Sequence, residues 1–126
     1  MAKTSYITVQ TRFAGIHNWG NCPLKEVGFL ANDHRHMFYV YVDMQVTHND
    51  RDLEFFIIQN ELNNIIKDWH ETDLTNGITI LGSRSCETIA DLFIEALRIL
   101  HPTVRWIRVS VSEDKENSGS VVWEAD

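Results

Sequence analysis

The stretch DHRHMFYVYVDMQV, residues 33–46, decides how the rest of the chain is interpreted. From Phe38 to Val46 every second residue is apolar, which is the period of a strand with one buried face. Side chains two residues apart on a strand project from the same face, so His34 and His36 should point together. Two imidazoles on one face can form half of a metal site or half of a proton-transfer site.

A second alternating segment comes before this one and should pair with it. Residues 6–13, YITVQTRF, alternate with apolar side chains on one face, and the chain reaches His17 before a long irregular stretch, residues 18–33. If the two strands pair antiparallel, the end of the first lies beside the start of the second, which carries His17 to His34 and His36. Catalytic zinc takes three protein ligands and keeps a fourth position open, and these three histidines supply that number. Three ordinary histidines without a metal are the alternative.

Two amphipathic helices follow the paired strands. Asp52 is a plausible N-cap for a helix whose apolar residues recur at helical spacing as far as Trp69. Ser83 or Ser85 can cap the second helix, which is predicted to stop at His101-Pro102.

Alternation over residues 104–111 and 118–123 then predicts two more strands. We therefore expect an α+β fold in one domain, residues 1–126, with a four-stranded antiparallel sheet and two helices on one face, in the order ββααββ. The other face of such a sheet is uncovered, with Tyr39 or Tyr41 or their alternates on it. A small domain often covers such a surface with further copies of itself, so a homo-oligomer is expected.

Composition narrows the classes of function. The chain has 126 residues and a formal net charge of -7, which argues against nucleic acid as the main partner because such binding needs clustered Lys and Arg. Its apolar runs are too short to cross a bilayer and it opens with no basic-then-apolar leader, so we expect no membrane partner and a cytoplasmic location. Two cysteines, Cys22 and Cys86, match no metal spacing. Cys86, at a helix start, could have a lowered pKa or could simply pack in the core.

Four short motifs occur in an order that resembles a known family. Phe13-Ala14-Gly15-Ile16-His17 is similar to Phe-x-Ala-Ala-His, and His34-Arg35-His36-Met37-Phe38-Tyr39-Val40 to His-Gly-His-x-(Phe/Tyr)-x-Val. Ser85-Cys86-Glu87-Thr88-Ile89-Ala90 is similar to Thr-(Ser/Thr)-Glu-Asn-x-Ala, and Val111-Ser112-Glu113 to Val-x-Glu. These are motifs of the family of 6-pyruvoyltetrahydropterin synthase and 6-carboxytetrahydropterin synthase, the latter an enzyme of the queuosine pathway.

The resemblance implies a tunnelling fold, a hexamer of two stacked trimeric rings, and roles for individual residues. His17, His34 and His36 would hold zinc. Glu113 would accept hydrogen bonds from the guanidine-like edge of a pterin or guanine-like ring, and Glu87 and Thr88 would help to frame that ring. His70 stands where the family places a proton-relay histidine.

The departures from the family pattern concern acid-base chemistry. Leu30 stands where the family has its usual catalytic cysteine, and Trp69 stands where it has an aspartate before the relay histidine. Cys22 and Glu26, both in the long loop, are the replacement candidates for the general base.

The sequence leaves several functions open. The leading hypothesis is a zinc-dependent lyase acting on dihydroneopterin triphosphate, with triphosphate elimination giving a 6-substituted tetrahydropterin. The alternative is a non-catalytic oligomer that binds a purine, pterin or nucleotide on the same fold. A third hypothesis is a structural oligomer without a ligand.

Overall fold

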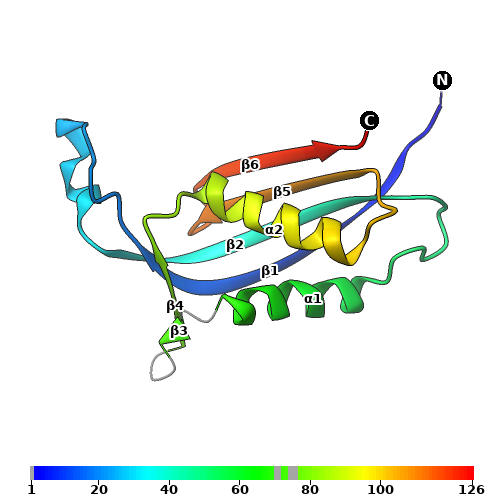
Figure 1. Cartoon of the computed structure of the whole chain (residues 1–126), viewed down its shortest axis with the longest axis horizontal. Helices are drawn as coiled ribbons and strands as arrows, with labels where there is room; N and C mark the ends of the chain where they lie inside the picture. Colours follow the sequence, from blue (N-terminus) through cyan, green and yellow to red (C-terminus); the bar gives the residue numbers. More distant parts are fainter. Residues whose placement is uncertain (1, 70–71, 74–76) are drawn as a thin grey trace.

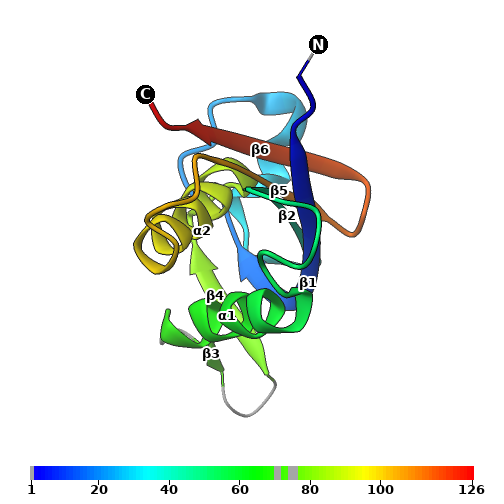
Figure 2. The same ribbon diagram turned by 90° about the vertical axis from the view of Figure 1, so that its right-hand side faces the viewer.

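The computed structural model of the chain describes residues 2–69, 72–73 and 77–126. Its strands form a six-stranded sheet in the order β3-β4-β1-β2-β5-β6, with both helices packed on one face (Figures 1 and 2). The elements, in chain order, are β1 (Ser5–His17), the 3₁₀ helix η1 (Lys25–Ala31), β2 (His34–Val46), α1 (Phe55–Asp68), β3 (Thr72–Asp73), β4 (Ile78–Gly82), α2 (Cys86–Leu100), β5 (Trp106–Glu113) and β6 (Asn117–Glu124).

The α+β class and the helices on one face are confirmed, but the prediction of a four-stranded ββααββ order is incomplete. Two short strands, β3 and β4, stand between the helices, and β4 runs parallel to the end of β1, with Gly15 beside Thr79 and Ile16 beside Ile80. The two strands have two and five residues, too few for alternation to be recognised. Their effect is to extend the sheet beside the end of β1 that carries His17.

The pairing of β1 with β2 is antiparallel, as predicted, and its register decides where the histidines lie. His17 lies opposite His34, and Gly15 lies opposite His36. Phe13 and Phe38 face each other on the helix-covered side and stack with ring centroids 5.4 Å apart. Gly15 is needed there, because a Cβ atom on it would lie 2.8 Å from both the Phe38 ring and the Leu81 side chain. The histidine end of the sheet is therefore supported directly by the core.

The first helix, α1, begins later than the sequence suggested. Asp52 does not cap it, because the Asp52 carboxylate accepts hydrogen bonds from the Thr47 N–H and hydroxyl, at 2.7 and 2.9 Å, and closes the turn after β2. These hydrogen bonds lower the pKa of Asp52. Glu54 is the N-cap and accepts from the Phe56 N–H. At the other end Trp69 packs edge-on against Phe93, with ring centroids 5.2 Å apart.

The second helix, α2, connects the core to the histidine end of the sheet. Ser85 is its N-cap, one of the two predicted candidates, and accepts from the Thr88 N–H at 3.1 Å. The helix ends at Leu100, before His101 and Pro102, as predicted. Because α2 lies across β5 and β6, its first residue, Cys86, lies beside Glu113 at the end of β5.

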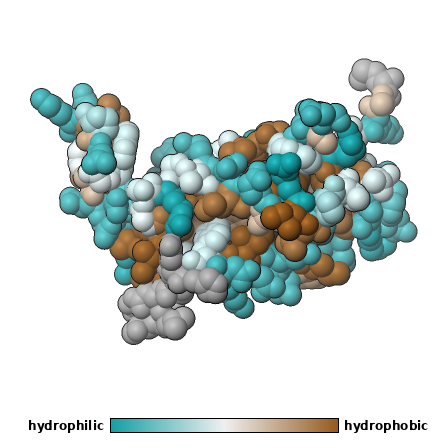
Figure 3. All heavy atoms as spheres, in the orientation of Figure 1, coloured by the Kyte–Doolittle hydropathy of each residue, from teal (hydrophilic) through white to brown (hydrophobic). Residues whose placement is uncertain are grey.

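In the described parts of the chain, no helix covers the opposite face of the sheet, as expected (Figure 2). Its side chains are mostly polar, and Tyr6 and Trp106 pair at one end with ring centroids 5.5 Å apart. The helix-covered side exposes apolar residues as well, visible over α1 and α2 in Figure 3; the exposed large ones in the two helices are Phe55, Phe56, Ile57, Ile99 and Leu100. In the described part of the chain, no helix is long and apolar enough to cross a membrane.

Candidate metal centre

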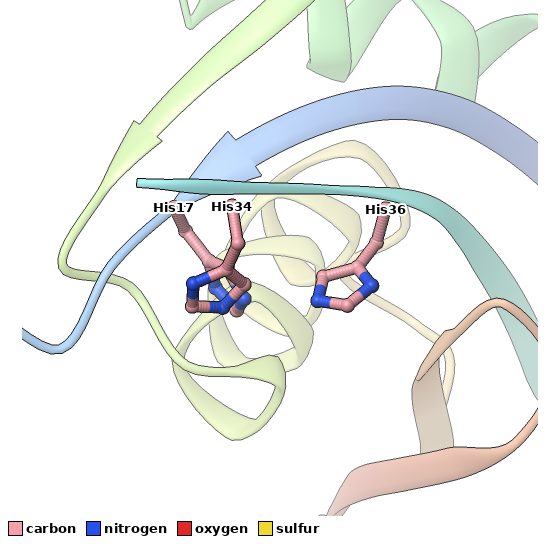
Figure 4. A group of neighbouring side chains, drawn as sticks. All are labelled: His17, His34 and His36. Atoms are coloured by element: carbon pink, nitrogen blue, oxygen red, sulfur yellow. The ribbon is translucent and has the colours of Figure 1, made fainter. Parts of the chain in front are cut away.

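Three histidine rings meet where β1 ends and β2 begins. One ring nitrogen each of His17, His34 and His36 lies within 4.8 Å of the others, and Figure 4 shows the three side chains projecting from neighbouring strands to the same side. His17 is the most deeply placed, with 7% of its surface exposed, and the other two are half-buried. The convergence follows from the strand register, because positions 34 and 36 share a face and His17 lies opposite His34.

Each ring is held through its Nδ1 atom by an acceptor of the protein. The Nδ1–H of His17 donates to the Arg84 carbonyl at 2.8 Å, and that of His34 donates to the Asn32 carbonyl at 2.9 Å. The Nδ1–H of His36 donates to the Asp114 carboxylate at 2.7 Å. Because carbonyl and ionised carboxylate oxygens have no proton to give, Nδ1 must be the protonated nitrogen in each ring. In the neutral form of each ring, Nε2 then carries the lone pair that metal-binding histidines use.

The donor set fits a divalent metal ion. The Nε2 atom of His17 is buried and has no hydrogen-bond partner, although buried nitrogens are nearly always satisfied. A metal ion bound to Nε2 would satisfy this atom. Three imidazoles form the donor set of some catalytic metal sites, and imidazole suits zinc, copper, iron and nickel.

The Glu113 carboxylate closes one side of the histidine group. Its Oε1 lies 3.1 Å from Nε2 of His17, and its Oε2 lies 3.4 Å from Nε2 of His36. Below the rings, Phe38 is fully buried, with its ring centroid 5.2 Å from that of His17 and 5.8 Å from that of His36. The site thus has an apolar floor and a charged wall.

A cavity of about 450 Å³ opens beside the histidines. Leu30 and Trp19 form part of its apolar lining, Trp19 being 43% exposed, while Arg84, Glu87 and Glu113 contribute charge. The full lining is His17, Asn18, Trp19, Leu30, His34, Ser83, Arg84, Ser85, Cys86, Glu87, Glu113, Asn117 and Ser118. This volume, with an aromatic side chain and two carboxylates, suits a planar polar ligand of modest size.

Cys86 and Glu87 form the wall at the N-terminus of α2. The Cys86 thiol is buried and donates to Oε1 of Glu113 at 3.8 Å. Burial, with the negative charges of Glu113 and Glu87, raises the pKa of Cys86 to about 12, so the hypothesis of a lowered pKa is wrong for this thiol. The Glu87 side chain crosses the backbone of β6 at Gly119, where a Cβ atom would run into Oε1 of Glu87. A side chain at position 119 would therefore push that carboxylate aside.

Other predicted site residues lie away from the cavity. Thr88 takes part in the Ser85 cap and does not line the cavity. Cys22 and Glu26 lie on or next to η1, which extends beyond the end of the sheet in Figure 1, and neither lines the cavity. The Cys22 thiol instead faces backbone carbonyls of its own loop at 3.7 Å. His70, the predicted proton relay, falls outside the described residues.

One residue that supports the site was not predicted. Asp114 accepts the Nδ1–H of His36 with one oxygen and the Met37 N–H, at 2.9 Å, with the other. These two hydrogen bonds, the bond from His36 first, lower the pKa of Asp114. Asp114 has φ 55° and begins the turn between β5 and β6, a conformation that aspartate tolerates better than most residues. The sequence shows that residues 113–116 are rich in acidic side chains. Only the register of the β5–β6 hairpin shows which of these side chains faces His36.

The chain matches no protein-family model and no curated protein sequence. Solved structures do match it. The 6-pyruvoyl tetrahydropterin synthase of Plasmodium falciparum has 14% identity and a TM-score of 0.68, covering 98% of this chain and 99% of that chain. The enzyme of the same name from Plasmodium vivax has 16% identity and a TM-score of 0.65 over 98% and 99% of the two chains. An uncharacterized protein of Wolinella succinogenes has 12% identity and a TM-score of 0.67 over 95% and 98%. The chain therefore has the fold of 6-pyruvoyltetrahydropterin synthase over nearly its whole length, as the motif resemblance predicted.

Proposed function

We propose that this protein binds zinc through His17, His34 and His36 and acts on a reduced pterin in the cavity beside them. The observation that carries the proposal is the common orientation of the three rings, each with Nδ1 satisfied and Nε2 turned to a shared point. The likeness in fold to 6-pyruvoyltetrahydropterin synthases supports the same reaction class. The proposed reaction is that of a 6-pyruvoyl- or 6-carboxytetrahydropterin synthase-like lyase on dihydroneopterin triphosphate.

The lining of the cavity supplies the contacts that a pterin requires. A carboxylate of Glu113 or Glu87 would accept two hydrogen bonds from the guanidine-like edge of the ring, a charge-assisted pairing. Trp19, exposed beside the cavity, would stack on the ring plane. Zinc, when bound, would supply Lewis-acid polarisation of the oxygens on the ring's side chain.

Proton transfer in this proposal falls to the long loop and to the residues after α1. His70 would act as the relay, and Glu26 or Cys22 would take a proton from the side chain of the substrate, which then loses triphosphate. A glutamate is described as a catalytic residue in the Plasmodium vivax enzyme, which favours Glu26 over Cys22. Because neither loop residue lines the cavity of one chain, the active site would be completed between chains.

The edges of the sheet support a homo-oligomer, proposed here as a hexamer. β6 is the last strand on its side of the sheet, and β1 is paired with β4 only at residues 15–17. Among the residues that the structure describes, these two strand edges are unpaired and lie on opposite sides of the sheet, which allows copies to join edge to edge into a ring. Native mass spectrometry tests this directly, since a monomer at micromolar concentration would contradict the assembly and the shared site.

The decisive experiment for the enzymatic proposal is an assay with zinc-loaded protein and dihydroneopterin triphosphate. We expect release of triphosphate together with a 6-substituted tetrahydropterin, identified by mass spectrometry. A His34→Ala variant, which removes one proposed ligand, should lose this turnover. No turnover by protein that is shown to hold zinc would reject the lyase proposal.

A second function, a non-catalytic binding protein, is favoured by two observations, at Leu30 and at Trp69. Leu30, which stands where the related family has its catalytic cysteine, does line the cavity, so an apolar side chain occupies that position. Trp69, in place of the family's aspartate, is used for packing against Phe13 and Phe93. In this case the protein would bind a pterin, purine or nucleotide tightly without turnover. Calorimetric titration with neopterin and guanosine, alongside the assay above, separates the two functions.

A further inference from the structure

Glu113 is in contact with ring nitrogen atoms of two of the proposed metal ligands. Its carboxylate oxygens face Nε2 of His17 and Nε2 of His36 at 3.1 and 3.4 Å. The protons of these rings are on Nδ1, where Arg84 and Asp114 accept them. In the neutral form of each ring, the Nε2 lone pair then faces a carboxylate oxygen, an arrangement that repels unless a proton or a metal ion lies between the two atoms.

A proton does not account for the closer of these two contacts. The Nε2 atom of His17 has no hydrogen-bond partner, so its contact with Oε1 of Glu113 lacks the alignment that an N–H donor requires. A metal ion binds off the line that joins two ligand atoms. In a tetrahedral zinc site with bonds of about 2.0–2.1 Å, neighbouring ligand atoms lie roughly 3.3 Å apart. The two distances from Glu113, 3.1 and 3.4 Å, lie on either side of this value.

We propose that Glu113 is a fourth, displaceable metal ligand that closes the site in the resting protein and leaves it when another oxygen or nitrogen ligand binds. This inference rests on the metal site proposed above. The carboxylate would lower the charge of the metal centre from +2 to +1 and keep water off the metal ion. The site would then become a strong Lewis acid only after a ligand has entered the cavity.

The surroundings of Glu113 fit both positions of its side chain. In the closed position, the Cys86 thiol donates to Oε1 at 3.8 Å and holds the carboxylate toward the histidines. The side chain is still 29% exposed and lines the cavity, so it can rotate away without disturbing the core. Glu87 also lines the cavity, but its carboxylate lies over Gly119 of β6. Glu87 therefore serves as a control of equal charge in the same cavity.

The test uses the full-length protein loaded with Co²⁺, whose visible absorption reports on the ligands around the metal. Wild type is compared with Glu113→Ala and Glu87→Ala for Co²⁺ affinity and for binding of azide, a small anion that needs an open position. Loss of an outer-shell partner already costs about 10–100-fold in metal affinity, so loss of a ligand should cost at least about 10-fold. We expect this loss of Co²⁺ affinity in Glu113→Ala but not in Glu87→Ala. Azide should also bind more tightly to Glu113→Ala than to wild type, because the fourth position is then open.

Two results would overturn the inference while leaving the metal site intact. One is equal azide affinity in wild type and Glu113→Ala, and the other is equal Co²⁺ affinity in the two proteins. If wild type binds no Co²⁺ at all, the proposed metal function fails and the inference with it. Circular dichroism of the metal-free proteins shows whether the alanine variant folds. If it does not, Glu113→Gln, which keeps the shape but not the charge, should show the same two changes in smaller measure.

Discussion

Replacing Asp114 by asparagine should weaken metal binding without disturbing the fold. Asp114 is the partner of His36 Nδ1, at 2.7 Å, and also accepts the Met37 N–H. The pKa of Asp114 is lowered, so its carboxylate is ionised at neutral pH. The carboxylate loses its charge, and His36 its charged partner, only as the pH falls below the usual carboxyl range. Asparagine is the suitable substitute because it tolerates the φ of 55° at this position and keeps one acceptor oxygen.

The expected size of the effect follows from the geometry. Losing an outer-shell partner costs about 10–100-fold in metal affinity, and the 48% exposure of the Asp114 side chain places this variant near the lower end, about 10-fold. Without the carboxylate, His36 can exchange its tautomer and direct Nε2–H at the metal position, which is the physical reason for the loss.

Competition with a chromophoric zinc chelator at neutral pH measures this change. Glu116→Gln is the matched control, because Glu116 lies in the same turn and its backbone N–H donates to Glu113, but its exposed side chain does not line the cavity. The control should bind zinc as wild type does. Zinc affinity in Asp114→Asn equal to that of the control would refute the role assigned to Asp114.

Three further predictions concern the core, the thiols and the helix cap. Phe38→Ala should lower the free energy of unfolding by about 3–5 kcal/mol, measured in urea, because the ring is fully buried; a loss below about 1 kcal/mol would contradict its place under the site. Because its pKa is raised to about 12, Cys86 should be a thiolate in only about 1 molecule in 10,000 at a pH of about 8. Iodoacetamide should therefore label Cys22 in the native protein and Cys86 only after unfolding. Rapid labelling of Cys86 in the native protein would show that its thiol is not buried beside Glu113 as described. Glu54→Ala should cost about 1 kcal/mol of stability in thermal melts, because α1 loses its N-cap. If Asp52→Ala loses helix in these melts and Glu54→Ala does not, Asp52 is the N-cap, as the sequence suggested.

The positions of the histidines could be predicted from the sequence because a strand has a strict period. Once residues 34–46 are assigned to a strand, His34 and His36 must share a face, and antiparallel pairing with the preceding strand brings His17 to them. The same reasoning failed for β3 and β4, because strands of two and five residues give no measurable alternation. The sequence pattern predicts the start of α1 two residues early, because Asp52 is a good N-cap by residue type but its carboxylate closes the turn after β2.

The roles of the acidic residues could not be predicted because they depend on side-chain direction across elements. Glu113 and Asp114 are adjacent in the sequence, yet one faces Nε2 atoms and the other faces a Nδ1 atom. This division comes from the turn conformation at Asp114, which a sequence pattern does not specify. Cys22 and Glu26 are candidates because of their residue types, their place in the long loop and the family resemblance, and a single chain does not bring them to the cavity.

The measurement that tests the central claim most directly is the metal content of protein purified without a histidine tag. The account predicts close to one zinc per chain by elemental analysis, lost on dialysis against a chelator and recovered on addition of zinc. It also predicts that His17→Ala, which removes the most deeply buried ring, does not recover zinc. Protein that contains no metal as purified and binds none afterwards would contradict the metal centre and every proposal that rests on it.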